Sequence, residues 1–134
     1  MVTGAAMFAD AALFEQVGGL DEHYFLYCEE DLAWQVWQAG RQVLVAPASE
    51  FTHLGGRSST ANYGLLREFY ISLAYFLRKN FSPTQAWLVR WVFIIKLVFR
   101  ARRGRHYMRL AQFLAQDAPM SASIRPVAAP NPML

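Results

Sequence analysis

Three consecutive carboxylates are the first residues in this sequence whose types and spacing could do chemistry. Glu29, Glu30 and Asp31 stand at the expected start of a helix. Like charge and partial burial together tune the pKa of a carboxyl group, which can then act as a general base. Aromatic residues that could form a platform for a sugar ring surround the cluster: Tyr24, Phe25, Tyr27, Trp34 and Trp37. An exposed first turn that only complements the helix dipole has the same composition, so both interpretations stay open.

A histidine beside a glycine-rich loop is the second candidate group. His53 is followed, after one residue, by the run from Gly55 to Ser58, which supplies backbone N–H groups, a guanidinium and a hydroxyl. These groups suit a diphosphate, or a metal that bridges one. The alternative is a loop histidine bonded to a neighbouring carbonyl.

The segment from Trp87 to Arg103 is apolar, aromatic and basic. Arg90 and Lys96 interrupt it, so we do not expect it to cross a bilayer, which takes about 20 apolar residues. Lys96, Arg100 and Arg103 share one helix face, which predicts a helix lying on an anionic membrane surface. The alternative is an ordinary helix buried against other protein. We do not expect nucleic-acid binding, because the segment is mainly aliphatic and no nucleic-acid motif accompanies it.

Charge divides the chain into two parts. The net charge of +3 combines −6 in residues 1–66 with +9 in residues 67–109, which suggests a site on the first part and an anionic partner for the second. Cys28 is the only cysteine, which excludes an intrachain disulfide and favours a reducing compartment. No segment of signal-peptide type opens the sequence. We therefore expect a cytoplasmic protein, peripheral on the inner face of the cell membrane.

The elements that must position these residues follow from periodicity and from capping residues. In the acidic part we expect a strand over 2–9, a helix over 11–17 capped by Asp10, and a loop over 20–28. A second helix should begin near Glu29 or Glu30 and end at Gly40. Short strands are expected over 42–46 and 50–53.

The basic part is expected to be helical. Helices are predicted over 61–80, over 83–103 with a capping box at Ser82 and Gln85, and from Gly104 to Gln116. A tail with four prolines, over 117–134, is expected to be disordered. Three regions result: an acidic segment 1–60, membrane-facing helices 61–116 and the tail 117–134.

Several motifs occur here in one order that resembles the family 2 (GT-A type) glycosyltransferases of the rhamnosyltransferase-like group. The resemblance covers roughly residues 2–80. The residues that carry it are Val2 to Met7, Phe14 to Glu22, Tyr24 to Tyr27, Glu29 to Trp34, Gln38 to Gly40, the strand to Pro47, His53 to Ser58 and Arg67 to Lys79.

The resemblance implies an α/β fold, here the C-terminal, acceptor-side half of a GT-A fold over residues 1–60, followed by amphipathic basic helices. It implies transfer of a sugar, with inversion, from a nucleotide-sugar to a lipid-linked or polysaccharide acceptor in cell-envelope glycan synthesis. It also implies a divalent metal, Mg²⁺ or Mn²⁺, at the leaving diphosphate, with His53 as the metal contact. Glu30 or Asp31 would be the base that deprotonates the acceptor hydroxyl. The substrate-binding residues implied are Gly4, Ala5, Asp21, Glu29, Trp34, Arg57 and Ser58.

The chain departs from the family pattern in three places. The acidic motif is one residue shorter than usual, which leaves the base open between Glu30 and Asp31. Gln35 stands where an arginine is frequent. The nucleotide-binding strands and the Asp-x-Asp metal motif are not in the sequence. We therefore expect a missing N-terminal half and no activity of this chain alone, and a non-catalytic membrane-associated or interaction fragment is the alternative function.

Overall fold

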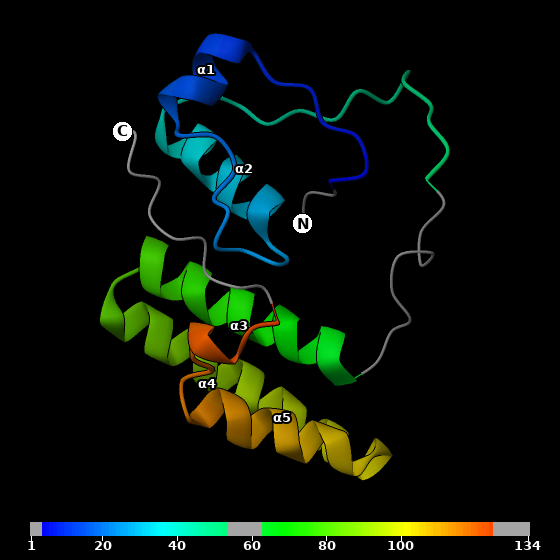
Figure 1. The fold of residues 1–134 in the computed structure, drawn as a ribbon, viewed down its shortest axis with the longest axis vertical. Helices are drawn as coiled ribbons and strands as arrows, with labels where there is room; N and C mark the ends of the chain where they lie inside the picture. The colour runs from blue at the N-terminus through cyan, green and yellow to red at the C-terminus, as the bar shows by residue number, and fades with distance from the viewer. Residues whose placement is uncertain (1–3, 54–62, 125–134) are drawn as a thin grey trace. The chain divides into compact units, whose positions relative to one another are not determined.

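The computed structural model describes residues 4–53 and 63–124 of the 134-residue chain (Figure 1). They belong to two compact units, Met1–Thr60 and Ala61–Leu134, each of which is described by itself. Every regular element in the described residues is a helix.

The predicted α/β class is wrong, because the described residues contain no strand and no sheet, and so no part of a GT-A sheet. Residues 4–9, 42–46 and 50–53, which we expected to be extended strands, are irregular. The run at Val43, Leu44 and Val45 is exposed. An apolar run becomes a strand only where another strand pairs with it, and the described residues offer none.

The first unit contains two helices, α1 (Ala11–Gln16) and α2 (Cys28–Gln38). The Asp10 carboxylate caps α1 by accepting the Leu13 N–H at 2.9 Å, as predicted. Both helices end in a left-handed glycine, Gly18 at φ +85° and Gly40 at φ +71°. The next N–H then bonds back to the helix, from Gly19 to the Phe14 carbonyl and from Arg41 to the Val36 carbonyl.

The core of this unit is small. Among its described residues, the buried apolar side chains are Tyr24, Leu32 and Val36. Leu32 and Val36 are one turn apart on α2, and Tyr24 comes from the loop before the helix. The core therefore fixes that loop against α2.

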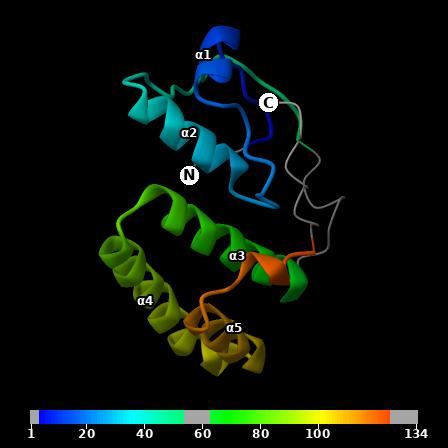
Figure 2. The ribbon, with the colours of Figure 1, turned by 60° about the vertical axis from the view of Figure 1, so that its left-hand side comes forward.

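The second unit is a helical bundle, visible from two directions in Figures 1 and 2. It consists of α3 (Tyr63–Asn80), α4 (Pro83–Arg100), the short 3₁₀ helix η1 (Ala101–Arg103), α5 (Arg105–Ala115) and the 3₁₀ helix η2 (Met120–Ala122). α4 packs along α5, and α3 contacts both. The capping box predicted at the start of α4 is present: Ser82 Oγ accepts the Gln85 N–H, and Gln85 Oε1 accepts the Ser82 N–H.

Residues 117–124 fold back onto the bundle instead of beginning a disordered tail. The Glu68 carboxylate is 1% exposed and accepts the Ser123 hydroxyl at 2.7 Å and the Ile124 N–H at 2.9 Å. Asp117 pairs with Arg78 and Arg90, and Ala118 is buried. The proline content did not indicate these anchors, because they depend on partners 27 to 56 residues away along the chain. The rest of the expected tail, 125–134, lies outside the described residues.

Candidate functional site

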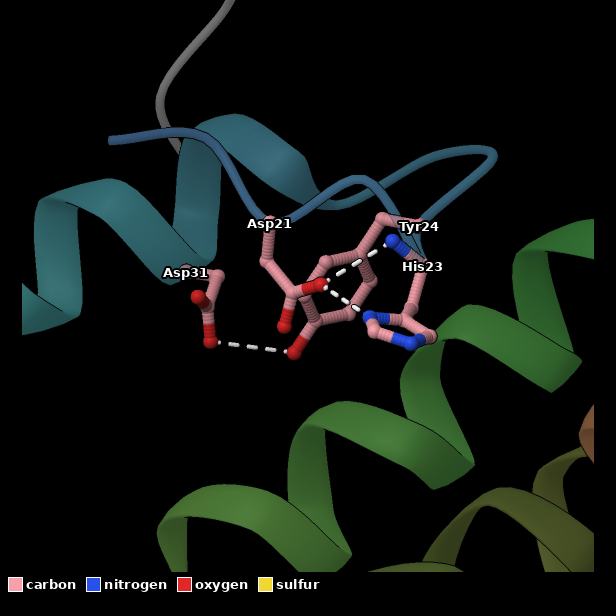
Figure 3. Close-up of polar contacts among 4 residues, drawn as sticks. All are labelled: Asp21, His23, Tyr24 and Asp31. Carbon is pink, nitrogen blue, oxygen red and sulfur yellow. Dashed lines mark hydrogen bonds and ion pairs between the residues drawn. The ribbon is translucent and has the colours of Figure 1, made fainter. Parts of the chain in front are cut away.

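The loop before α2 positions a histidine against a carboxylate. Asp21 Oδ1 accepts the backbone N–H of His23 at 2.9 Å and lies 2.8 Å from Nδ1 of its imidazole (Figure 3). The Asp21 side chain is mostly covered, whereas that of His23 is 47% exposed. Asp21 therefore orients an imidazole that remains open to solvent, an arrangement suited to proton transfer.

A second polar pair joins the loop to the helix. The Tyr24 hydroxyl donates to Asp31 Oδ1 at 3.0 Å, as Figure 3 shows, and the two residues are 1% and 2% exposed. A buried carboxylate is costly unless it is hydrogen-bonded, and this bond supplies one partner. The side chain of Asp31, one of the two candidate bases, is therefore buried in the core of the first unit.

Glu30, the other candidate base, is partly exposed. Burial raises the pKa of its carboxyl above the ordinary value, and the negative charge of Glu29 adds to the rise. A carboxylate with a raised pKa is a stronger base at neutral pH than an ordinary one. The structure therefore gives the two candidates different environments, one partly open to solvent and one internal.

Glu30 shares a face of α2 with two indole rings. Trp34 and Trp37 follow at i+4 and i+7, which places all three side chains on one side of the helix, opposite buried Leu32. The two rings lie 5.1 Å apart between centroids and are tilted by 41°. We call Glu30, Trp34 and Trp37 the outer face of α2.

Glu29 lies beside the N-terminal segment and the thiol. A Cβ placed on Gly4 would come within 2.6 Å of Cδ of Glu29, so the Gly4 backbone approaches this side chain closely. Cys28 Sγ donates to Glu29 Oε2 at 3.2 Å. Burial, and then this bond and the charge of Glu29, raise the pKa of the Cys28 thiol to about 11. The thiol is therefore protonated at neutral pH.

Only some of the remaining predicted site residues lie in the part of the chain that the structure describes. Ala5 is half-buried, and His53 is exposed in the irregular stretch after α2, while Arg57 and Ser58 lie outside the described residues. In residues 4–53 and 63–124, no three His, Cys, Asp or Glu side chains converge into a metal-binding group. The described residues alone do not fit a metal site, so the metal stays a prediction.

His23 and the Tyr24 hydroxyl were absent from the predicted site. The spacing of Asp21 and His23 contains a signal for the first, because an aspartate accepts the N–H two residues later in an Asx turn. The Tyr24 bond spans seven residues and depends on how the loop packs on α2, so no local pattern indicates it.

A pocket of about 300 Å³ lies in the second unit, where α3 ends and α4 begins. Its polar lining consists of Arg78, Arg90 and Asp117. Asp117 pairs with both arginines, at 3.2 and 2.6 Å, and no other described carboxylate lines the pocket to act as a base. We therefore place the candidate site at α2.

Comparisons with protein-family models, with curated proteins and with solved structures find no match to this chain.

Proposed function

We propose that this chain supplies the acceptor-binding and catalytic-base region of an inverting glycosyltransferase that uses a nucleotide-sugar donor and a lipid-linked or glycan acceptor. The observation that carries the proposal is the outer face of α2, where a partly exposed carboxylate of raised pKa shares a helix face with two tryptophans. The proposal does not require the α/β fold that the resemblance implied.

In this proposal the indole rings bind the sugar. The C–H face of a pyranose ring is apolar and packs on an aromatic ring, and its hydroxyls stay at the edges for hydrogen bonding. An acceptor on Trp34 would lie next to the Glu30 carboxylate, one turn earlier on the same face.

Glu30 is the base in the reaction step. Its carboxylate removes the proton of the acceptor hydroxyl, whose oxygen attacks the anomeric carbon of the donor. The bond from that carbon to the diphosphate breaks, and the nucleoside diphosphate leaves with the electron pair. Asp31 acts as a positioning residue, because its bond to Tyr24 fixes the loop against α2.

The test separates binding from chemistry. This chain alone is not expected to transfer a sugar, so it is joined to a nucleotide-sugar-binding domain and incubated with radiolabelled nucleotide-sugars and a polyprenyl-diphosphate-linked saccharide. Transfer by the joined enzyme and acceptor binding by the chain are both measured. We expect Glu30→Gln to lower transfer by about 100-fold or more with acceptor binding retained, the usual range for loss of a general base. Trp34→Ala should weaken acceptor binding instead.

The matched control is Glu22→Gln, since Glu22 is an exposed carboxylate in the preceding loop. Transfer by Glu30→Gln at the wild-type rate would show that Glu30 is not the base. No binding of the acceptor saccharide by the chain, together with no transfer by the joined enzyme, would favour the second candidate, a non-catalytic membrane-associated or interaction fragment. That candidate is supported by the lack of a sheet in the described residues.

A further inference from the structure

The helix α4 is apolar over more of its surface than the bundle buries. Ile94 and Leu97 are buried in the bundle. Seven other large apolar side chains on the same helix are between 41% and 71% exposed, and they form what we call the outer face of α4: Trp87, Leu88, Trp91, Val92, Ile95, Val98 and Phe99.

These seven side chains make one continuous strip. At 100° per residue they fall within an arc of about 140°, and at a rise of 1.5 Å they extend over about 18 Å of helix. A helix that is apolar all round is normally covered all round, and a large exposed apolar patch marks an interaction site. We therefore expect a partner to cover the outer face of α4.

Charge indicates which partner. Lys96 and Arg100 are exposed one turn apart on the side of α4 next to one edge of the strip, about 40° and 80° around the helix from Val92. Arg102 and Arg103 follow in η1. α4 contains no acidic residue. Residues 63–124 hold ten arginines and lysines against Glu68 and Asp117, a net charge of +8. Both acidic residues are already engaged, Glu68 with Ser123 and Asp117 with two arginines.

Two other partners fit less well. A second copy would bring the same positive charge against this edge, which opposes association through the outer face. A transmembrane arrangement does not apply to the described residues, since none of their helices combines the length and hydropathy needed to cross a bilayer.

We propose that the outer face of α4 docks in the plane of an anionic lipid bilayer. Its apolar strip enters the boundary between headgroups and acyl chains, and Lys96 and Arg100 extend toward lipid phosphates. Trp87 and Trp91, whose rings form an edge-to-face pair 6.1 Å apart, have the amphipathic character that favours this boundary. The inference rests on the second unit alone and does not depend on the proposed glycosyl transfer.

Vesicle co-sedimentation of the full chain tests the proposal. We expect binding to vesicles of phosphatidylcholine with 30% phosphatidylglycerol, weak binding to phosphatidylcholine alone, and loss of binding as salt is raised. Trp91→Gln with Ile95→Gln should lower the apparent affinity by about tenfold or more. Both side chains are exposed, so helix content by circular dichroism should be unchanged.

A matched control replaces an apolar side chain of similar exposure elsewhere. Leu66→Gln alters an exposed leucine of α3 and should bind as the wild type does. Lys96→Gln with Arg100→Gln should weaken binding to the anionic vesicles only.

Three results would overturn the proposal. They are no binding to either vesicle, equal binding to both, and equal loss of binding in the Leu66 variant and in the double variant of the outer face. Light scattering identifies the chief rival. A dimer of the wild type that dissociates in the Trp91→Gln, Ile95→Gln variant, without vesicle binding, would assign the strip to a second copy.

Discussion

At the scale of single residues, three adjacent carboxylates have different environments because a helix turns by 100° per residue. Asp31 points into the core and meets Tyr24, Glu30 lies on the partly exposed outer face of α2, and Glu29 lies against Gly4 and the Cys28 thiol. The sequence alone did not distinguish Glu30 from Asp31 as the base. Their difference in burial supports Glu30 as the base and Asp31 as a positioning residue.

Glu29 can be tested through its neighbour Cys28. A thiol pKa of about 11 instead of the ordinary 9.0 lowers the thiolate fraction at neutral pH by about 100-fold, so alkylation should be slow. Burial is the largest cause of this rise, and the bond and charge of Glu29 come next. Glu29→Gln should therefore speed iodoacetamide labelling at pH 8 several-fold without reaching the rate of the urea-unfolded chain.

The same substitution should act on Glu30. Removing the negative charge of Glu29 should lower the raised pKa of the Glu30 carboxyl, which a carbon-13 NMR titration of the carboxyl signals measures. Glu22→Gln serves as the control for both measurements. Unchanged labelling of Cys28 in Glu29→Gln would mean that Glu29 does not influence the thiol.

At the scale of elements, local signals predicted the helices well. Ser82, Pro83 and Gln85 indicated the start of α4, and Gly40 indicated the end of α2, because caps and left-handed glycines act within a few residues. The predicted strands were wrong, because a strand depends on a partner strand elsewhere in the chain and the described residues supply none. The bond of Glu68 to Ser123 and Ile124 was missed for the same reason.

The capping box of α4 gives a prediction at this scale. Ser82→Ala removes the acceptor of the Gln85 N–H and should lower the free energy of unfolding by about 1 kcal/mol, the usual cost of a lost N-cap. The measurement is urea unfolding followed by circular dichroism, to which the 18-residue helices α3 and α4 contribute strongly. Thr84→Ala, an exposed hydroxyl in the same turn, is the control. Equal stability of the two variants would contradict the role of the cap.

At the scale of the whole molecule, the two units differ in how much apolar surface they bury. In the first, the described buried apolar side chains are Tyr24, Leu32 and Val36, whereas Phe8, Leu44 and Val45 are 80% to 99% exposed. The second buries side chains from α3, α4 and α5 together, among them Ile71, Leu97, Leu110 and Leu114. Since burial is the main favourable term in folding, a small core gives a small free energy of opening.

Amide hydrogen exchange should report this difference directly. Exchange occurs through local opening, and each factor of ten in protection corresponds to about 1.4 kcal/mol of opening free energy. We expect the amides of α2 to exchange about 100-fold faster than those in the middle of α3, at one pH and after correction for intrinsic rates. Because both helices belong to one chain, α3 is the internal control. Protection of α2 equal to that of α3 would mean that the first unit is stabilised by contacts beyond its own small core.

Adding a lipid-linked saccharide that binds the outer face of α2 should raise the protection of α2 and leave that of α3 unchanged, because a ligand stabilises only the state that binds it.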